Sequence, residues 1–425
     1  MTGDDCLPNV ARDSVGQKFI RFLAFLPRPG LLGFLLSVLI LICVALFILL
    51  FGESPRLRHG IVGKAHKFLT STFPNVISLL LRKLIGQRNL KRLSSCWSYC
   101  CESRNPFLQI FFVLLTSVSI GGFLVFALPH IPGIYLGPIH LYIIPCQIIW
   151  LYVAYYIACS ADPGTVTKEN ALFYIDLFPY DELLYTSKDC TTCLLPKPPR
   201  SKHCSMCKSC ISKLDHHCAW LNQCVGYNNH RYFFLFLFTL TQFCAYGFYL
   251  CFQVYRGMII EWGLDHAYLL DRRTGEQIPL SFRKAMTHIL HRDRIIGSIG
   301  ILSFVITVVV FIFMVYQLYL AGRGLTTNEA FKWEMLEDAI DRGDIWIVEE
   351  TLTTKPTTNG STATSSNETR QFARNRRQKT KPDPSNTISS IKERQVKSLD
   401  EVDNIYDLGF KQNLLQVFFP KIPPH

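Results

Sequence analysis

The sequence predicts an all-α polytopic membrane protein with about five transmembrane helices and a small cytosolic cysteine-rich domain between the third and fourth of them. Two observations support this fold class. The chain of 425 residues is 49% hydrophobic with a mean hydropathy of +0.19, and its apolar residues gather in long runs that hold almost no charge. Between the third and fourth runs, seven cysteines and three histidines fall in one short polar stretch, Cys190 to Cys224.

Each apolar run is long enough to cross a bilayer, for which a helix needs about 20 residues. A buried core helix is the alternative for any single run. The third run contains Pro145 and Gln147, which a helix tolerates where neighbouring helices satisfy the freed backbone groups. The first run is too long and too far from the start for an ordinary cleaved signal peptide, so we interpret it as a span that follows an N-terminal segment, 1–30. The predicted spans are 31–51, 108–128, 139–159, 232–255 and 296–320.

Lys and Arg in the short loops predict the orientation. The 52–107 segment holds ten basic residues against Glu53 and Glu102, so we expect it in the cytosol. The loop after the second span has no Lys or Arg and is expected in the lumen. This places the cysteine-rich domain, 160–231, in the cytosol, the 256–295 loop in the lumen and the C-terminal tail in the cytosol. By parity the N-terminus is lumenal, although four basic residues oppose this mildly: Arg12, Lys18, Arg21 and Arg28.

The net charge of +12 raises the question of a nucleic-acid partner. Basic cytosolic loops lying against anionic lipid explain the charge better in a chain with several spans. We therefore expect membrane lipids as partners and no nucleic acid.

The cytosolic tail divides into three parts. Thr326 and Glu329 have the spacing of a capping box, which predicts a helix in the 321–350 region. The 351–397 segment is polar and is predicted to be a disordered linker. The final 398–425 segment is rich in aromatic and aliphatic residues, and we expect it to dock on the bilayer surface or on the bundle. Its apolar side chains are Tyr406, Leu408, Phe410, Leu414, Leu415, Val417, Phe418 and Phe419.

The cysteine-rich stretch faces the reducing cytosol, where metal binding or catalysis is a better explanation than disulfides. Structural zinc takes four Cys or His ligands, usually supplied as closely spaced pairs. Two zinc ions would use eight of the ten candidates. The two that remain are most naturally one cysteine and one histidine, which is a nucleophile with its base. The ten candidates are Cys190, Cys193, His203, Cys204, Cys207, Cys210, His216, His217, Cys218 and Cys224.

The spare pair is expected in the sequence Asp-His-His-Cys, 215–218. Adjacent residues of an extended backbone point to opposite faces, so one histidine can face a metal while the other faces a reaction. Asp215 can orient an imidazole, and a neighbouring imidazolium would make Cys218 largely thiolate. The fourth span begins soon afterwards, which places Cys218 at the membrane surface. A fatty acyl thioester suits this position, since each buried methylene contributes about 0.8 kcal/mol.

These residues resemble the cysteine-rich domain of the DHHC protein S-acyltransferases, or palmitoyltransferases. The pattern C-x2-C-x9-HC-x2-C-x2-C-x4-DHHC-x5-C-x4-N-x3-F is complete from Cys190 to Phe233. Two further motifs of the family are present, "DPG" at 162–164 and "TTNE" at 326–329, and Asn413 matches an asparagine of its tail element. Ala219 and Gln223 depart from the family's usual Pro and Asn. The extra N-terminal span and the tail look most like the fungal branch that acylates SNAREs and other single-span proteins.

The resemblance implies a two-step transfer of a fatty acyl group, typically palmitoyl, from acyl-CoA to cysteines of substrate proteins. Cys218 would become the S-acyl enzyme, with His216 as general base and Asp215 orienting it. It implies that Thr327 hydrogen-bonds Asp215, and that the membrane is that of the endoplasmic reticulum, with the Golgi as alternative. The two implied structural zinc sites are Cys190, Cys193, His203 and Cys210, and Cys204, Cys207, His217 and Cys224.

Three basic residues before the first histidine are candidates to contact the phosphates of CoA: Lys197, Arg200 and Lys202. A solvated face near lipid headgroups is the alternative for them. Two other functions fit these residues less well. A zinc-stabilised membrane scaffold would not need Asp215, His216 and Cys218 together, and a RING-like ubiquitin ligase would need a longer loop between its ligand pairs.

Overall fold

The computed structural model describes residues 60–270, 275–353, 367–375 and 387–422, with the single positions 44, 48, 52 and 57. The predicted N-terminal segment, 1–30, and nearly all of the predicted first span, 31–51, lie outside the described residues. The chain divides into two compact units, Met1–Ile48 and Leu49–His425. The description below concerns the second unit.

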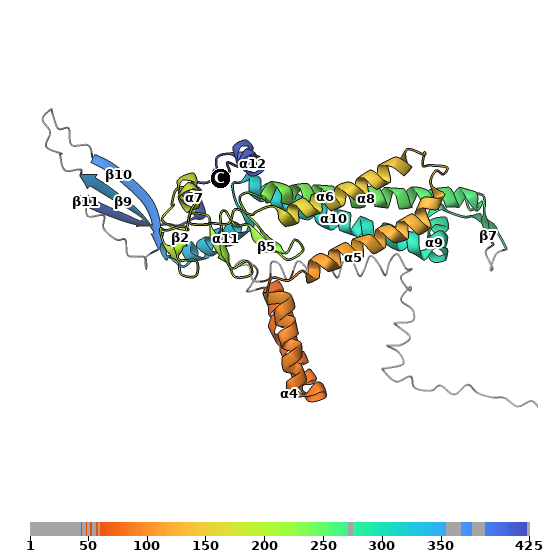
Figure 1. The fold of residues 1–425 in the computed structure, drawn as a ribbon, viewed down its shortest axis with the longest axis horizontal. Helices are drawn as coiled ribbons and strands as arrows, with labels where there is room; N and C mark the ends of the chain where they lie inside the picture. The colour runs from red at the N-terminus through yellow and green to blue at the C-terminus, as the bar shows by residue number, and fades with distance from the viewer. Residues whose placement is uncertain are drawn as a thin grey trace, which may run out of the picture. The chain divides into compact units, whose positions relative to one another are not determined.

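Four described helices are long and apolar enough to cross a membrane. They coincide with the last four predicted spans, and they indicate a membrane protein. In the bundle, α8 packs against α6 on one side and α10 on the other (Figure 1). Ile306, Val310 and Met314 of α10 pack against the apolar core, whereas Phe311, Ile312 and Val315 are exposed on its outer side, as lipid contact requires. The four are α5 with its short helical continuation, Phe107–His130, then α6 (His140–Ser160), α8 (His230–Glu261) and α10 (Arg294–Gly322).

The cysteine-rich region is built from three small antiparallel hairpins and not from helices, so the all-α prediction is corrected here. Each hairpin turns through a residue with positive φ at the same position, Leu194, Lys208 or Asn222. Strands of two or three residues bury too little apolar surface to hold together alone. The hairpins are β1 (Asp189–Cys190) with β2 (Leu195–Pro196), β3 (Lys202–Cys204) with β4 (Ser209–Ile211), and β5 (His216–Cys218) with β6 (Gln223–Val225). The short helix α7 (Ala171–Leu177) precedes them.

The connecting segments are more ordered than the sequence predicts. Helices occupy much of the basic 52–107 segment, and a hairpin with a helix occupies much of the 256–295 loop. The first group is α3 (Ile61–Lys67), η1 (Phe68–Thr72) and α4 (Phe73–Glu102). The second is β7 (Tyr268–Leu270), β8 (Gln277–Pro279) and α9 (Phe282–Arg292).

The predicted capping box is confirmed, and α11 (Thr327–Asp341) begins at it. The prediction of a disordered linker over 351–397 differs from the structure at the described residues of this segment. These residues belong to a three-stranded sheet of order β10-β9-β11. Its central strand starts with the β-branched, apolar residues Ile345 and Ile347, which are buried against Leu336 and Ile340 of α11. The strands are β9 (Ile345–Thr353), β10 (Asn367–Asn375) and β11 (Thr387–Gln395).

The aromatic-rich C-terminal segment docks on the helical bundle. After the turn η4 (Leu399–Glu401), helix α12 (Phe410–Phe418) buries Val417 against Phe234 of α8 and Ala321 of α10. Asn413 Nδ2 donates to the carbonyl of Gly322 (2.9 Å), and its Oδ1 accepts from the Leu408 N–H (2.9 Å). Asn413 therefore connects the last turn of α10 to the C-terminal segment.

We expect Asn413→Ala to lower the free energy of unfolding by about 1–3 kcal/mol, since it leaves buried polar groups unpaired. Thermal unfolding of the full chain in detergent measures this loss. The matched control is Gln412→Ala, one residue earlier and exposed to solvent. An equal shift in the two variants would contradict the anchoring role of Asn413.

Candidate active site

The structure brings eight of the ten Cys and His candidates into two clusters, the two sets that the family resemblance implies. Within each, the ligand atoms lie within 4.8 Å of one another. The Nδ1 atom of His203 lies 3.2 Å from the Sγ of Cys193. The Nδ1 atom of His217 lies 3.4 Å from the Sγ of Cys207 and 3.5 Å from that of Cys224. Three thiols and one imidazole form a complete tetrahedral donor set, which fits a structural zinc ion.

Hairpin register explains how the ligands meet. In β3 and β4, His203 pairs with Cys210, and both belong to the first cluster. In β5 and β6, His217 pairs with Cys224, and both belong to the second. Cys204 follows His203 directly but faces the other cluster, because successive side chains of a strand point to opposite sides. This alternation interleaves the two sets along the chain.

The remaining candidates, His216 and Cys218, lie on the same strand as His217 but on its other face. They are two residues apart in β5, so their side chains point to the same side. Asp215 is buried, and its Oδ2 lies 2.6 Å from the Nδ1 of His216. A carboxylate, an imidazole and a thiol, those of Asp215, His216 and Cys218, therefore lie next to one another outside the two metal clusters.

Cys218 lies where the cysteine-rich region meets the bundle. Its side chain packs on the apolar cluster formed by α6, α8 and the loop after β5, which includes Leu151, Tyr155, Phe236 and Leu221. A thiol in this place borders apolar helix surface on one side and the polar hairpins on the other.

The three groups shift one another's ionisation. Burial by itself would raise the pKa of Asp215, but the hydrogen bond and charge of His216 lower it to about 2. Burial would lower the pKa of His216, but its hydrogen bonds to Asp215 and Cys218 raise it to about 10. Burial would likewise raise the pKa of the Cys218 thiol, but the hydrogen bond and charge of His216 lower it. The arrangement favours an imidazolium beside a thiolate, which is the reactive form of cysteine.

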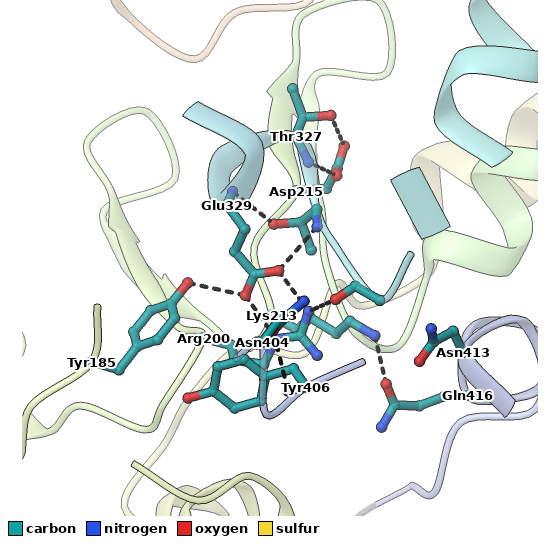
Figure 2. A network of polar contacts seen from close by, with 12 residues as sticks. Tyr185, Arg200, Lys213, Asp215, Thr327, Glu329, Asn404, Tyr406, Asn413 and Gln416 are labelled. Carbon is teal, nitrogen blue, oxygen red and sulfur yellow. Dashed lines mark hydrogen bonds and ion pairs between the residues drawn. The ribbon is translucent and has the colours of Figure 1, made fainter. Parts of the chain in front are cut away.

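The N-terminus of α11 points at Asp215 (Figure 2). The backbone N–H of Thr327 donates to Asp215 Oδ1 (2.6 Å), and its hydroxyl donates to Oδ2 (3.0 Å). The positive end of the helix dipole adds to this stabilisation of the carboxylate. The hydrogen bond implied by the resemblance is thus present, and the Thr327 hydroxyl shares Asp215 Oδ2 with the Nδ1 of His216.

Sequence reasoning missed Gln317. This side chain is 2% exposed within α10, and its Nε2 donates to the Thr327 hydroxyl (3.0 Å). The available signal was a polar residue in an otherwise apolar run, since polar groups within spans are costly and usually have a specific partner.

Of the three basic residues predicted to contact CoA, the structure changes the interpretation of Arg200. It is 1% exposed and pairs with Glu329, so its guanidinium is not presented to a phosphate in solvent. Lys202 is exposed and donates from Nζ to Asn328 Oδ1 (2.8 Å). Lys197 is partly exposed and directly follows strand β2.

Comparison with known proteins extends the resemblance over most of the chain. The family model of DHHC palmitoyltransferases matches residues 184–334. The chain is 29% identical to palmitoyltransferase swf1 of Schizosaccharomyces pombe, over 92% of this chain and 98% of that protein. It is 30% identical to palmitoyltransferase swf1 of Emericella nidulans, over 92% and 97%. It is 27% identical to palmitoyltransferase ZDHHC4 of Mus musculus, over 71% and 82%.

Proposed function

We propose, for this chain that belongs to the fungal Swf1 branch of the DHHC palmitoyltransferase family, that Cys218 carries the acyl group. The chain is a protein S-palmitoyltransferase. In the proposal, His216 is the general base and Asp215 orients it. Membership in this family replaces the scaffold and RING-like interpretations. One observation carries the assignment of roles. Once two sets of four ligands are taken, His216 and Cys218 remain on one face of β5, with Asp215 2.6 Å from the imidazole.

The proposed reaction has two steps that share one base. His216 takes the proton of the Cys218 thiol, and the thiolate attacks the carbonyl carbon of acyl-CoA. The bond from that carbon to the sulfur of CoA breaks, and CoA leaves with the proton held by His216. A cysteine thiol of the substrate protein then gives its proton to His216 and attacks the carbonyl of the S-acyl enzyme. The bond to Cys218 breaks, and Cys218 recovers the proton.

The metal ions have a structural role in this proposal. Zinc held by Cys190, Cys193, His203 and Cys210, and by Cys204, Cys207, His217 and Cys224, would cross-link hairpins that are too short to be stable alone. Both sets lack an open ligand position, which supports a role in folding and not in chemistry. Asp215, His216 and Cys218 would then carry the chemistry, on or next to a hairpin that a metal ion holds in place.

The proposal extends to the substrates and the compartment, and membership in the family and the four apolar helices support it. We place the active site at the cytosolic side of the endoplasmic reticulum membrane, with the Golgi as alternative, and palmitoyl-CoA as acyl donor. Substrates are proteins with cysteines next to a span, such as SNAREs. Lys197 and Lys202 remain as candidates to contact the phosphates of CoA, and Thr327 holds Asp215 through two hydrogen bonds.

Labelled palmitoyl-CoA tests the proposal on the full chain. Hydroxylamine-sensitive label should map to Cys218 by peptide mass spectrometry. His216→Gln should slow its appearance by about 10²- to 10⁴-fold, the usual contribution of a general base, and should keep the zinc content. The matched control is His288→Gln, at an exposed position on α9. A wild-type rate in His216→Gln would contradict the role of base.

A further inference from the structure

We propose that Arg200 is a positioning residue for acyl transfer: acting through Glu329, it fixes the first turn of α11 so that Thr327 holds Asp215 in the orientation that His216 requires. The inference rests on the proposed roles of Asp215 and His216, and it adds a residue that does not touch the reacting atoms. Figure 2 shows the contacts that connect Arg200 to Asp215.

The Arg200–Glu329 pair is fully buried and bidentate. Arg200 Nε donates to Glu329 Oε1 (2.7 Å), and Nη2 donates to Oε2 (2.5 Å). The side chains are 0% and 1% exposed. Nη2 also donates to the carbonyl of Gly324 (2.7 Å), in the turn between α10 and α11. The guanidinium carbon lies 4.7 Å from the centre of the Tyr406 ring, so the C-terminal segment covers the pair.

The same carboxylate determines where α11 begins. Glu329 Oε2 accepts from the backbone N–H of Thr326 (3.0 Å), and Oε1 accepts from the Tyr185 hydroxyl (3.0 Å). The Thr326 hydroxyl accepts from the Glu329 N–H (3.2 Å), which completes the capping box. Thr327, the next residue, makes both hydrogen bonds to Asp215. A shift of the cap would therefore move the donors on Asp215.

Electrostatics explains why Arg200 is needed at this point. Burial would raise the pKa of Glu329, but the charge of Arg200 keeps it lowered. Without the guanidinium, Glu329 would be a buried charge with no bidentate partner. It would gain a proton or turn away, and either change weakens its bond to the Thr326 N–H. Lysine supplies the charge but lacks the planar fork that fills both oxygens.

Single-turnover acylation of the full chain by palmitoyl-CoA tests the proposal in Arg200→Lys. Its amplitude reports the fraction of competent enzyme, and its rate constant reports the chemistry. We expect unchanged zinc content and amplitude, and a rate constant lower by about 10- to 100-fold, the scale for a small displacement of catalytic groups. The concentration of palmitoyl-CoA at half-maximal rate should stay the same. Glu329→Gln should give the same pattern.

The matched control is Arg342→Lys, which alters an exposed arginine–carboxylate pair with Asp338 at the other end of α11 and should leave the rate constant unchanged. A wild-type rate constant in Arg200→Lys overturns the proposal. A fall in amplitude alone, or loss of zinc from both variants, shows a purely structural pair and also overturns it. An altered palmitoyl-CoA dependence alone would return Arg200 to CoA binding. A failure of the proposed function itself would look different, because the wild-type protein would then carry no acyl label on Cys218.

Discussion

Cys218→Ser is expected to lose all hydroxylamine-sensitive acyl label at the site while keeping its full zinc content. Neither metal-ligand cluster includes Cys218, so exchanging its sulfur for oxygen removes the nucleophile and leaves both donor sets complete. A serine hydroxyl beside His216 is a much weaker nucleophile than a thiolate, and an oxygen ester would resist hydroxylamine under mild conditions. The measurements are label stoichiometry after incubation with palmitoyl-CoA and metal analysis of the same sample.

The control for this variant is Cys146→Ser, an exposed cysteine of α6 that lies outside both clusters. It should acylate at the wild-type rate. Equal label in Cys218→Ser and the wild type would refute Cys218 as the acyl carrier. Reduced zinc in Cys218→Ser would mean that a ligand has been mistaken for a nucleophile.

Cys193→Ser should have the largest effect on stability. Structural zinc contributes about 10–16 kcal/mol of apparent binding free energy in small zinc domains, which is comparable with the whole stability of a typical domain. The hairpins β1/β2 and β3/β4 have strands of two or three residues and depend on such a cross-link. We expect zinc loss, rapid proteolysis of the cysteine-rich region and, as a consequence, no acyl label.

Cys218→Ser is the matched comparison for Cys193→Ser, since both exchange one sulfur for one oxygen in the same small region. The first should stay folded without label, and the second should lose fold, metal and label together. Metal content and protease resistance of Cys193→Ser equal to those of the wild type would contradict its assignment as a ligand.

Local patterns in the sequence were enough for much of the fold and the site. Helical spans follow from uninterrupted apolar runs, and the start of α11 follows from the three-residue spacing of Thr326 and Glu329. The count of ligands left one cysteine and one histidine over, and strand alternation separates His216 from His217. These features depend on backbone geometry within a few residues and on the valence of a metal ion, so they can be read without knowing how the chain folds back.

Only the tertiary structure decided which distant groups meet. Arg200 reads in the sequence as one of several basic residues near a membrane, but it pairs with Glu329, 129 residues later. Gln317 reaches Thr327 from within α10, and Lys213 donates to Gln416, 203 residues away. Such pairs depend on the packing of β-hairpins, α11 and the C-terminal segment around one buried polar core. Charge and composition do not encode that packing, because the chain holds many carboxylates that could pair with a guanidinium, and only the packing brings Glu329 to Arg200.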